Sequence, residues 1–183
     1  MYHSGNQMID VHRLFEKAQI RPSMHVADFG CGKTGHIIFP VAKIIGEMGV
    51  VYAVDILQEV LLEIKKRSNW NSFLNIHTIW SNIEKIGSTK ISSKSLDVGF
   101  LVNILSQTEN KIATLEEAFR LLKDKARLVV VDWDKKGLLF GPEDKNHIDF
   151  DQIKHWARKK GLAIQEEFDM GKFHKGIILY KHE

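Results

Sequence analysis

Short apolar runs of strand character alternate with segments of helical periodicity over the first 133 residues of the chain. The runs are HVADF (25–29), VVYAVDI (50–56), LNIHTIW (74–80), LDVGFLV (96–102) and RLVVVDW (127–133). Two intervening segments carry the apolar stripe of a helix face: Leu57, Val60, Leu61 and Ile64, and then Leu115, Ala118, Phe119 and Leu122. Because parallel strands are joined by long crossovers, usually helices, the alternation predicts βαβ units and a parallel sheet.

The pattern changes after residue 133. A loop containing glycine and proline leads to Asp149, which with Gln152 forms a capping-box-like start for a helix that places Ile153, Trp156 and Ala157 inward. Two more strand-like runs, LAIQEEF and KGIILYK, are joined by DMGKFH, which is too short for a crossover helix, so they must pair antiparallel. The sequence therefore predicts an α/β fold with a doubly wound, seven-stranded, mostly parallel sheet, an antiparallel last strand and helices on both faces.

Composition limits the classes of function. The 183 residues, 44% of them hydrophobic, suit a single domain spanning residues 1–183. The 26 basic and 23 acidic residues are interspersed, which argues against a nucleic-acid partner. A single cysteine excludes an internal disulfide or a zinc site built from several thiolates, so we expect a reducing, cytoplasmic location. Nine scattered histidines lack the spacing that would place two metal ligands on one helix face, so we expect no metal. The chain shows neither a signal-peptide core nor eighteen consecutive apolar residues, so no membrane span is predicted.

The glycine-rich stretch VADFGCGKTGH (26–36) admits three interpretations. A P-loop ends in Gly-Lys-Thr, but its required first glycine would fall on Ala27, inside a strand. A dinucleotide site fits Gly30, Gly32 and Gly35, with Asp55 ending the next strand, although Asp28 would place a negative charge near a pyrophosphate. A site for S-adenosylmethionine is the third interpretation.

This third interpretation rests on a family resemblance that spans nearly the whole chain. VADFGCGKTGH resembles motif I of the class I S-adenosylmethionine-dependent methyltransferases. VVYAVDI resembles their second strand, LLKDKARLVVVDW their helix, turn and fifth strand, and FHKGIILYK their final antiparallel strand. The overall pattern is most similar to the ubiquinone- and menaquinone-type small-molecule branch. The resemblance implies a Rossmann-like fold, S-adenosylmethionine as cofactor and methyl transfer as the activity.

The resemblance also assigns the turn after the first strand to the methionine and ribose of the cofactor. Its cofactor-binding positions in this chain are Asp28, Gly30, Cys31, Gly32, Thr34 and Gly35. Glycine lets the backbone approach the ligand, and a helix beginning near Thr34 would point free N–H groups at the methionine carboxylate while Asp28 helps to hold the ammonium. Cys31 is expected to pack rather than react. The third glycine comes one residue later than in the family's usual spacing.

The remaining cofactor positions follow later strands. Asp55 is expected to accept hydrogen bonds from both ribose hydroxyls, with Ile56 beside it, and it could also cap the following helix. Asn82 stands where the family commonly has an acidic residue near the adenine amine. Its amide oxygen can still accept a hydrogen bond from that amine while Ile83 N–H reaches a ring nitrogen. Alternatively, Asn82 is an ordinary turn residue. Asn103 matches a position that contacts cofactor or substrate, or it caps its loop.

No catalytic side chain is assigned, because alignment and desolvation can drive an in-line methyl transfer without a dedicated residue. We expect a small-molecule acceptor, with the helix in residues 1–20 and the loop of residues 133–148 as segments that could cover it as a lid. The oligomeric state is not predicted. Two alternatives remain open at this stage: an NAD(P)-binding protein, or a protein that binds S-adenosylmethionine without catalysis.

Overall fold

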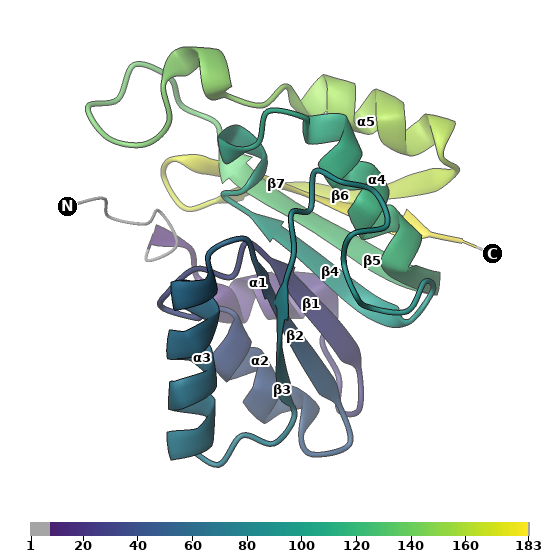
Figure 1. Cartoon of the computed structure of the whole chain (residues 1–183). Helices are drawn as coiled ribbons and strands as arrows, with labels where there is room; N and C mark the ends of the chain where they lie inside the picture. The colour runs from purple at the N-terminus through teal and green to yellow at the C-terminus, as the bar shows by residue number, and fades with distance from the viewer. Residues whose placement is uncertain (1–7, 183) are drawn as a thin grey trace.

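The computed structural model describes residues 8–182, and its centre is a twisted sheet (Figure 1). Among the described residues the strands are β1 His25–Phe29, β2 Val50–Asp55, β3 Ile76–Trp80, β4 Leu96–Val102, β5 Leu122–Trp133, β6 Leu162–Met170 and β7 His174–Lys181. Their order is β3-β2-β1-β4-β5-β7-β6. β1 to β5 run parallel, whereas β7 is antiparallel to both β5 and β6. The predicted seven-stranded sheet with its antiparallel last strand is confirmed.

Helices cover both faces of this sheet. They are α1 Val11–Ala18, α2 Ile38–Ile45, α3 Gln58–Trp70, α4 Lys111–Leu121 and α5 Phe150–Lys159, with short 3-10 turns η2 Leu105–Gln107 and η3 Asp144–Asn146. Buried side chains of α1, α2 and α3 pack on one face, and those of α4 and α5 pack on the other. The core therefore has two layers separated by the sheet, as the doubly wound pattern requires.

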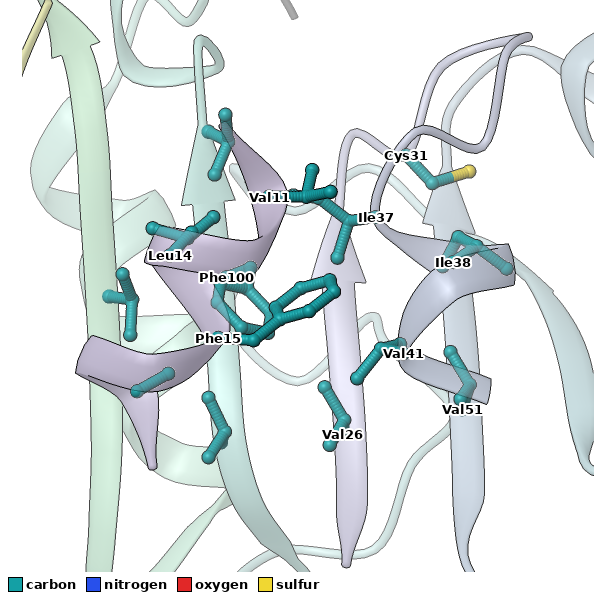
Figure 2. Packing of buried hydrophobic residues seen from close by; sticks show 14 of the residues in the cluster. Val11, Leu14, Phe15, Val26, Cys31, Ile37, Ile38, Val41, Val51 and Phe100 are labelled. Carbon is teal, nitrogen blue, oxygen red and sulfur yellow. The ribbon is translucent and has the colours of Figure 1, made fainter. Parts of the chain in front are cut away.

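The core on the α1 face is built around an aromatic contact. Phe15 of α1 meets Phe100 of β4 edge to face, with ring centroids 5.9 Å apart, and Val26 of β1 and Val41 of α2 lie beside them (Figure 2). Val11, Leu14, Phe15 and Ala18 of α1 are all buried, whereas Met8 lies before the helix and is 40% exposed. α1 is thus part of the core and holds the first strands in place.

Three details of the predicted elements are wrong. β5 starts at Leu122, directly after α4, so Leu122 is a buried strand residue and the last inward residue of α4 is Leu121. The register between β4 and β5 shifts between Leu96 and Val98, and this irregularity accommodates the extra residues of β5 that looked like a turn. Leu57 is the residue that precedes α3, and it is half exposed.

The start of α5 agrees with the prediction. The Asp149 carboxylate accepts hydrogen bonds from Asp151 N and Gln152 N, which leaves fewer unpaired donors in the first helical turn. Ile153, Trp156 and Ala157 are buried. The sixteen residues 134–149 that precede this helix form the predicted loop, interrupted only by η3, at the carboxyl end of β5.

Candidate functional site

The turn that follows β1 is held open by glycines. Gly30, Gly32 and Gly35 have positive φ angles of 76°, 61° and 56°, which other residues rarely adopt. At Gly30 a Cβ atom would lie 2.5 Å from Ile104 Cδ1, so no side chain fits there without moving Ile104. Gly30 N and Cys31 N donate to Val54 O (2.8 and 3.1 Å), which fixes the turn to the end of β2.

Asp55, at the end of β2, is tied to this turn through its carboxylate. Its Oδ2 accepts from Gly32 N (3.1 Å), and its Oδ1 accepts from Leu57 N (3.0 Å), where α3 begins. Asp55 is 9% exposed. Since a carboxylate oxygen has more than one lone-pair site, both oxygens keep capacity for another donor. Asp55 thus joins the glycine turn to the start of α3 and can still bind a ligand.

Asp28, at the end of β1, is a buried carboxylate with no hydrogen-bond partner among residues 8–182. It is 3% exposed, and burial, helped by the charge of Asp55, raises its pKa from 3.8 to about 8. An isolated buried carboxylate is costly and is uncommon unless a ligand or partner compensates it. The pair of Asp28 and Asp55 makes this edge of the sheet a place where a cation would be stabilised.

Cys31 lies within this cluster and is a buried free thiol. Its Sγ is 4.0 Å from Asp55 Oδ2, and it is buried in the core below the turn (Figure 2). Burial and the charges of Asp28 and Asp55 all raise the pKa of the thiol. Because the thiolate is the nucleophilic form, the packing role expected for Cys31 is the one its surroundings favour.

The helix expected near Thr34 begins later than the sequence indicates. Gly35 N donates to Gly32 O to close a turn, Gly35 has a left-handed conformation, and α2 starts only at Ile38. The prediction of a helix beginning near Thr34 is therefore wrong, because the additional residue in the turn is used in a non-helical bend. Thr34 itself is exposed, and its carbonyl accepts from the Arg67 guanidinium (2.7 Å).

Arg67 was not identified from the sequence. It projects from α3, donates also to Lys33 O (3.3 Å), and lies 4.2 Å from the ring centroid of Phe39. It therefore fixes the outer side of the glycine turn. An arginine on the surface of a helix carries no local signal for such a contact, so only the assembled fold reveals it.

The adenine-side positions lie at the ends of β2 and β3. Ile56 is 54% exposed, and its carbonyl accepts from Trp80 Nε1 (2.8 Å). Asn82 Oδ1 accepts from Glu84 N (3.0 Å), which is the hydrogen bond of an ordinary turn residue, and Ile83 is buried with no acceptor for its N–H among the described residues. The ends of β2 and β3 thus offer an exposed apolar side chain, Ile56, and a backbone donor without an acceptor, Ile83 N.

Asn103 closes the end of β4. It has a positive φ of 55°, its N donates to Val131 O (2.8 Å), and its carbonyl accepts from the Gln107 side chain. The next residue, Ile104, fills the space that a Cβ at Gly30 would need. Asn103 therefore shapes the loop that packs against the glycine turn.

The chain segment before α1 crosses the same edge of the sheet. His36 lies before α2, and its Nε2 donates to Ile9 O (3.0 Å). On the other side, a Cβ atom on Gly171 in the hairpin between β6 and β7 would lie 3.1 Å from Met8 O. Residues 8–10 thus connect the glycine turn with that hairpin.

Comparison with known proteins assigns the family. A family described as a methyltransferase domain matches residues 20–177. The chain belongs to this methyltransferase-domain family. The strand order supports the assignment, because the dinucleotide-binding order 3-2-1-4-5-6 has no antiparallel strand inserted beside β5. The search of curated proteins found no significant match.

Solved structures share the fold of this methyltransferase-domain chain at low identity. A SAM dependent methyltransferase from Aquifex aeolicus is 22% identical, with a TM-score of 0.83 over 97% of this chain and 92% of that one. The [4+2]-cyclase SpnF is 10% identical, with a TM-score of 0.77 over 97% and 81%. The YcgJ protein from Bacillus subtilis is 12% identical, with a TM-score of 0.73 over 94% and 98%.

Among residues 8–182, no group of three or more His, Cys, Asp or Glu side chains could hold a metal ion. No helix in the same part of the chain has the length and apolar character needed to cross a membrane.

Proposed function

We propose that this methyltransferase-domain chain binds S-adenosylmethionine at the edge formed by Asp28, the Gly30–Gly35 turn and Asp55, and transfers its methyl group to a small-molecule acceptor. The observation that carries the proposal is Asp28, a buried carboxylate without a partner at the end of the first strand. The cofactor carries an ammonium group that would compensate this carboxylate. Its sulfonium supplies an electrophilic methyl group when it is bound.

The residues present fit such a ligand. The left-handed glycines at 30, 32 and 35 leave backbone without side chains along the turn, and an uncharged ribose needs this close approach of the backbone. Asp55 can accept from vicinal hydroxyls with the capacity left on its two oxygens. Exposed Ile56 and the free N–H of Ile83 suit the face and edge of a base. Cys31, Gly32, Thr34, Gly35, Asn82 and Asn103 complete the proposed cofactor site.

The chain's contribution to the reaction is alignment. Holding two reactants in line can lower a barrier by about 7–11 kcal/mol without an acid or base. Asp28 and Asp55 would fix the ends of the ligand, while Ile104 supplies apolar surface beside Gly30. We assign no proton-transfer residue to this step.

The acceptor is proposed to be small, in keeping with the resemblance to ubiquinone- and menaquinone-type methyltransferases and with the dispersed surface charge. A second candidate function is cofactor binding without methyl transfer. The similarity to SpnF, whose name describes a cyclase, favours keeping this candidate, because one fold supports different chemistries.

Calorimetric titration with S-adenosylhomocysteine tests the proposal. We expect binding in the micromolar range, with no competition by NAD or ATP at millimolar concentration. Asp55→Ala should weaken binding by roughly 1.5–3 kcal/mol, the value of hydrogen bonds to a charged group. Asp97→Ala is the matched control, since Asp97 is bonded to His25 N and Lys123 at the opposite end of the strands. Unchanged affinity in Asp55→Ala would refute the role of Asp55.

Methyl transfer is separated from binding alone by incubating the protein with labelled cofactor and a metabolite extract. Protein-dependent transfer of label supports the enzyme. If the protein binds S-adenosylhomocysteine and transfers no label to any extract component, the second candidate function is favoured.

A further inference from the structure

A cluster of aromatic rings closes the end of β5 on the α1 face of the sheet. Trp133 and His174 are opposite one another in the β5–β7 ladder, with ring centroids 4.3 Å apart. Phe140, from the loop after β5, meets Trp133 at 5.9 Å and Phe173 at 5.1 Å, both edge to face. These four residues are called the β5-end cluster below.

His174 in this cluster has no partner for either ring nitrogen. It is 2% exposed, and neither Nδ1 nor Nε2 has a hydrogen bond. Burial lowers the pKa of its imidazole from 6.5 to about 4, so the ring is neutral at pH 7 and offers one donor and one acceptor. A phenylalanine would fill the same space without unsatisfied polar atoms, so packing alone does not explain a histidine here.

The β5-end cluster lies on the same face of the sheet as Asp28. Asp28 pairs with Phe100 of β4, and Phe100 pairs with Val129 of β5. Residues four apart on a strand point to the same face, so Trp133 shares the face of Val129, and His174 shares that of Trp133. β5 is two strands from β1, about 10 Å away at the usual strand spacing, and Trp133 lies four residues, or about 13 Å, beyond Val129 toward the carboxyl end. The β5-end cluster therefore lies past the carboxyl ends of the parallel strands, on the same face as Asp28.

The loop over Trp133 has the features of a segment that can move aside. Gly137 and Gly141 have positive φ angles of 69° and 94°, and between them Leu139 is fully exposed and Phe140 is 45% exposed. A Cβ atom on Gly141 would lie 3.1 Å from the Trp133 ring, so the loop backbone covers this ring directly. Displacing residues 137–141 would uncover Trp133 and would break the ring contacts of Phe140 with Trp133 and Phe173.

Two lysines lie near the ring of Phe173 in the β5-end cluster. Lys135 Nζ and Lys172 Nζ lie 5.9 and 5.6 Å from the ring centroid of Phe173. They come from different segments, the loop after β5 and the β6–β7 hairpin. Together they place positive charge beside the ring of Phe173, which favours a ligand with a negative group.

On the basis of the proposed methyl transfer, on which this assignment depends, we propose that Trp133, Phe173 and His174 bind the methyl acceptor, a planar aromatic anion that hydrogen-bonds to His174. Phe140 holds the place that the ring of the acceptor takes. The aromatic walls select a flat molecule, the unpaired nitrogens of His174 select a hydroxyl or amino group, and the two lysines select the negative charge. His174 is a positioning residue, because its neutral ring orients the acceptor.

The test is titration of the S-adenosylhomocysteine complex with 4-hydroxybenzoate, followed by calorimetry and by saturation transfer from protein to probe protons. Cyclohexanecarboxylate, an anion that is not planar, is the matched probe. We expect 4-hydroxybenzoate to bind and cyclohexanecarboxylate to bind at least several-fold more weakly. His174→Phe should weaken 4-hydroxybenzoate binding by roughly tenfold, the effect of one lost hydrogen bond. It should also raise the melting temperature by roughly 2–4 °C, because two unpaired polar atoms are removed.

Phe140→Ala keeps the test decisive even if His174→Phe does not fold, because Phe140 lies on an exposed loop. Removing a side chain that competes with the probe should tighten 4-hydroxybenzoate binding several-fold, whereas Leu139→Ala should leave it unchanged. The proposal is overturned if wild-type protein does not bind 4-hydroxybenzoate at millimolar concentration, if His174→Phe binds it equally well, or if Phe140→Ala fails to tighten binding. Failure to bind S-adenosylhomocysteine would instead overturn the proposed function.

Discussion

Binding of the cofactor is predicted to release a proton from Asp28. With a pKa of about 8, this carboxyl group at pH 7 is protonated about ten times as often as it is ionised. An ammonium group placed beside it favours the ionised form, so about 0.9 proton per bound cofactor should leave the site. Ionising Asp28 at pH 7 costs about 1.4 kcal/mol, and this cost disappears above pH 8. The affinity should therefore rise about tenfold per pH unit up to pH 8 and then level off.

Calorimetry in two buffers measures this release directly. S-adenosylhomocysteine, which keeps the ammonium group, is titrated at pH 7 in phosphate and in Tris, whose ionisation enthalpies differ widely. The difference in observed enthalpy, divided by the difference in buffer enthalpy, gives the number of protons released. Asp28→Asn should bind more weakly and release none. Asp132→Asn is the matched control, because Asp132 is equally buried and its oxygens already accept from Ser106 N and Trp133 N.

The refuting result is a binding enthalpy that does not depend on the buffer.

The raised pKa of Asp28 also predicts how the stability of the protein depends on pH in the absence of ligand. Because the folded-state pKa of Asp28 is raised above 3.8, its contribution to stability is fully present below pH 3.8 and is lost as pH rises to about 8. Asp28→Asn should therefore stabilise the unliganded protein at pH 8, by about 1–4 kcal/mol in urea unfolding, relative to wild type.

Three further substitutions test the surroundings of the site. Gly35→Ala should destabilise the protein by about 1–3 kcal/mol in urea unfolding, because its Cβ would lie 2.7 Å from Ile64 Cδ1 at a positive φ; no loss of stability would contradict this. Arg67→Ala should weaken S-adenosylhomocysteine binding roughly three- to tenfold in calorimetry through a looser glycine turn, whereas Lys66→Ala should not. Glu117→Gln should cost about 2–3 kcal/mol of stability at pH 7, because buried Glu117 accepts from Arg120 and from two backbone N–H groups. Burial acts to raise the pKa of Glu117, but these hydrogen bonds outweigh it and lower the pKa to about 2. The stabilisation by Glu117 is therefore present above pH 4.5 and is lost as the pH falls toward 2. In thermal melts, Glu117→Gln should not show this loss of stability in acid.

The fold was predictable because its signals are local and repeated. Each parallel strand is a short apolar run, and β1 and β4 have the predicted bounds. The antiparallel pairing of β6 and β7 followed from the length of one connection. The error at Leu122 arose because a helix and a strand meet there without a turn, so two periodic patterns share one apolar residue.

The site was less predictable because it depends on contacts between distant segments. The spacing of the glycines indicated a tight turn, but it did not show that Gly35 delays α2 until Ile38. Sequence alone also gave no reason to connect Arg67 with Thr34, or His174 with Trp133. These pairs form only when the strands assemble. Arg67 lies 33 positions from Thr34, and His174 lies 41 positions from Trp133, so neither contact has a local sequence signal.

The position of β7 has a consequence for how the protein assembles during synthesis. β6 precedes β7 in the chain, yet it reaches the rest of the sheet only through β7, which pairs with β5 on its other side. While the ribosome is still adding β7, β5 keeps an open edge and β6 has no strand to join, a state prone to aggregation. The β5 edge is therefore covered only once β7 is free to pair with it.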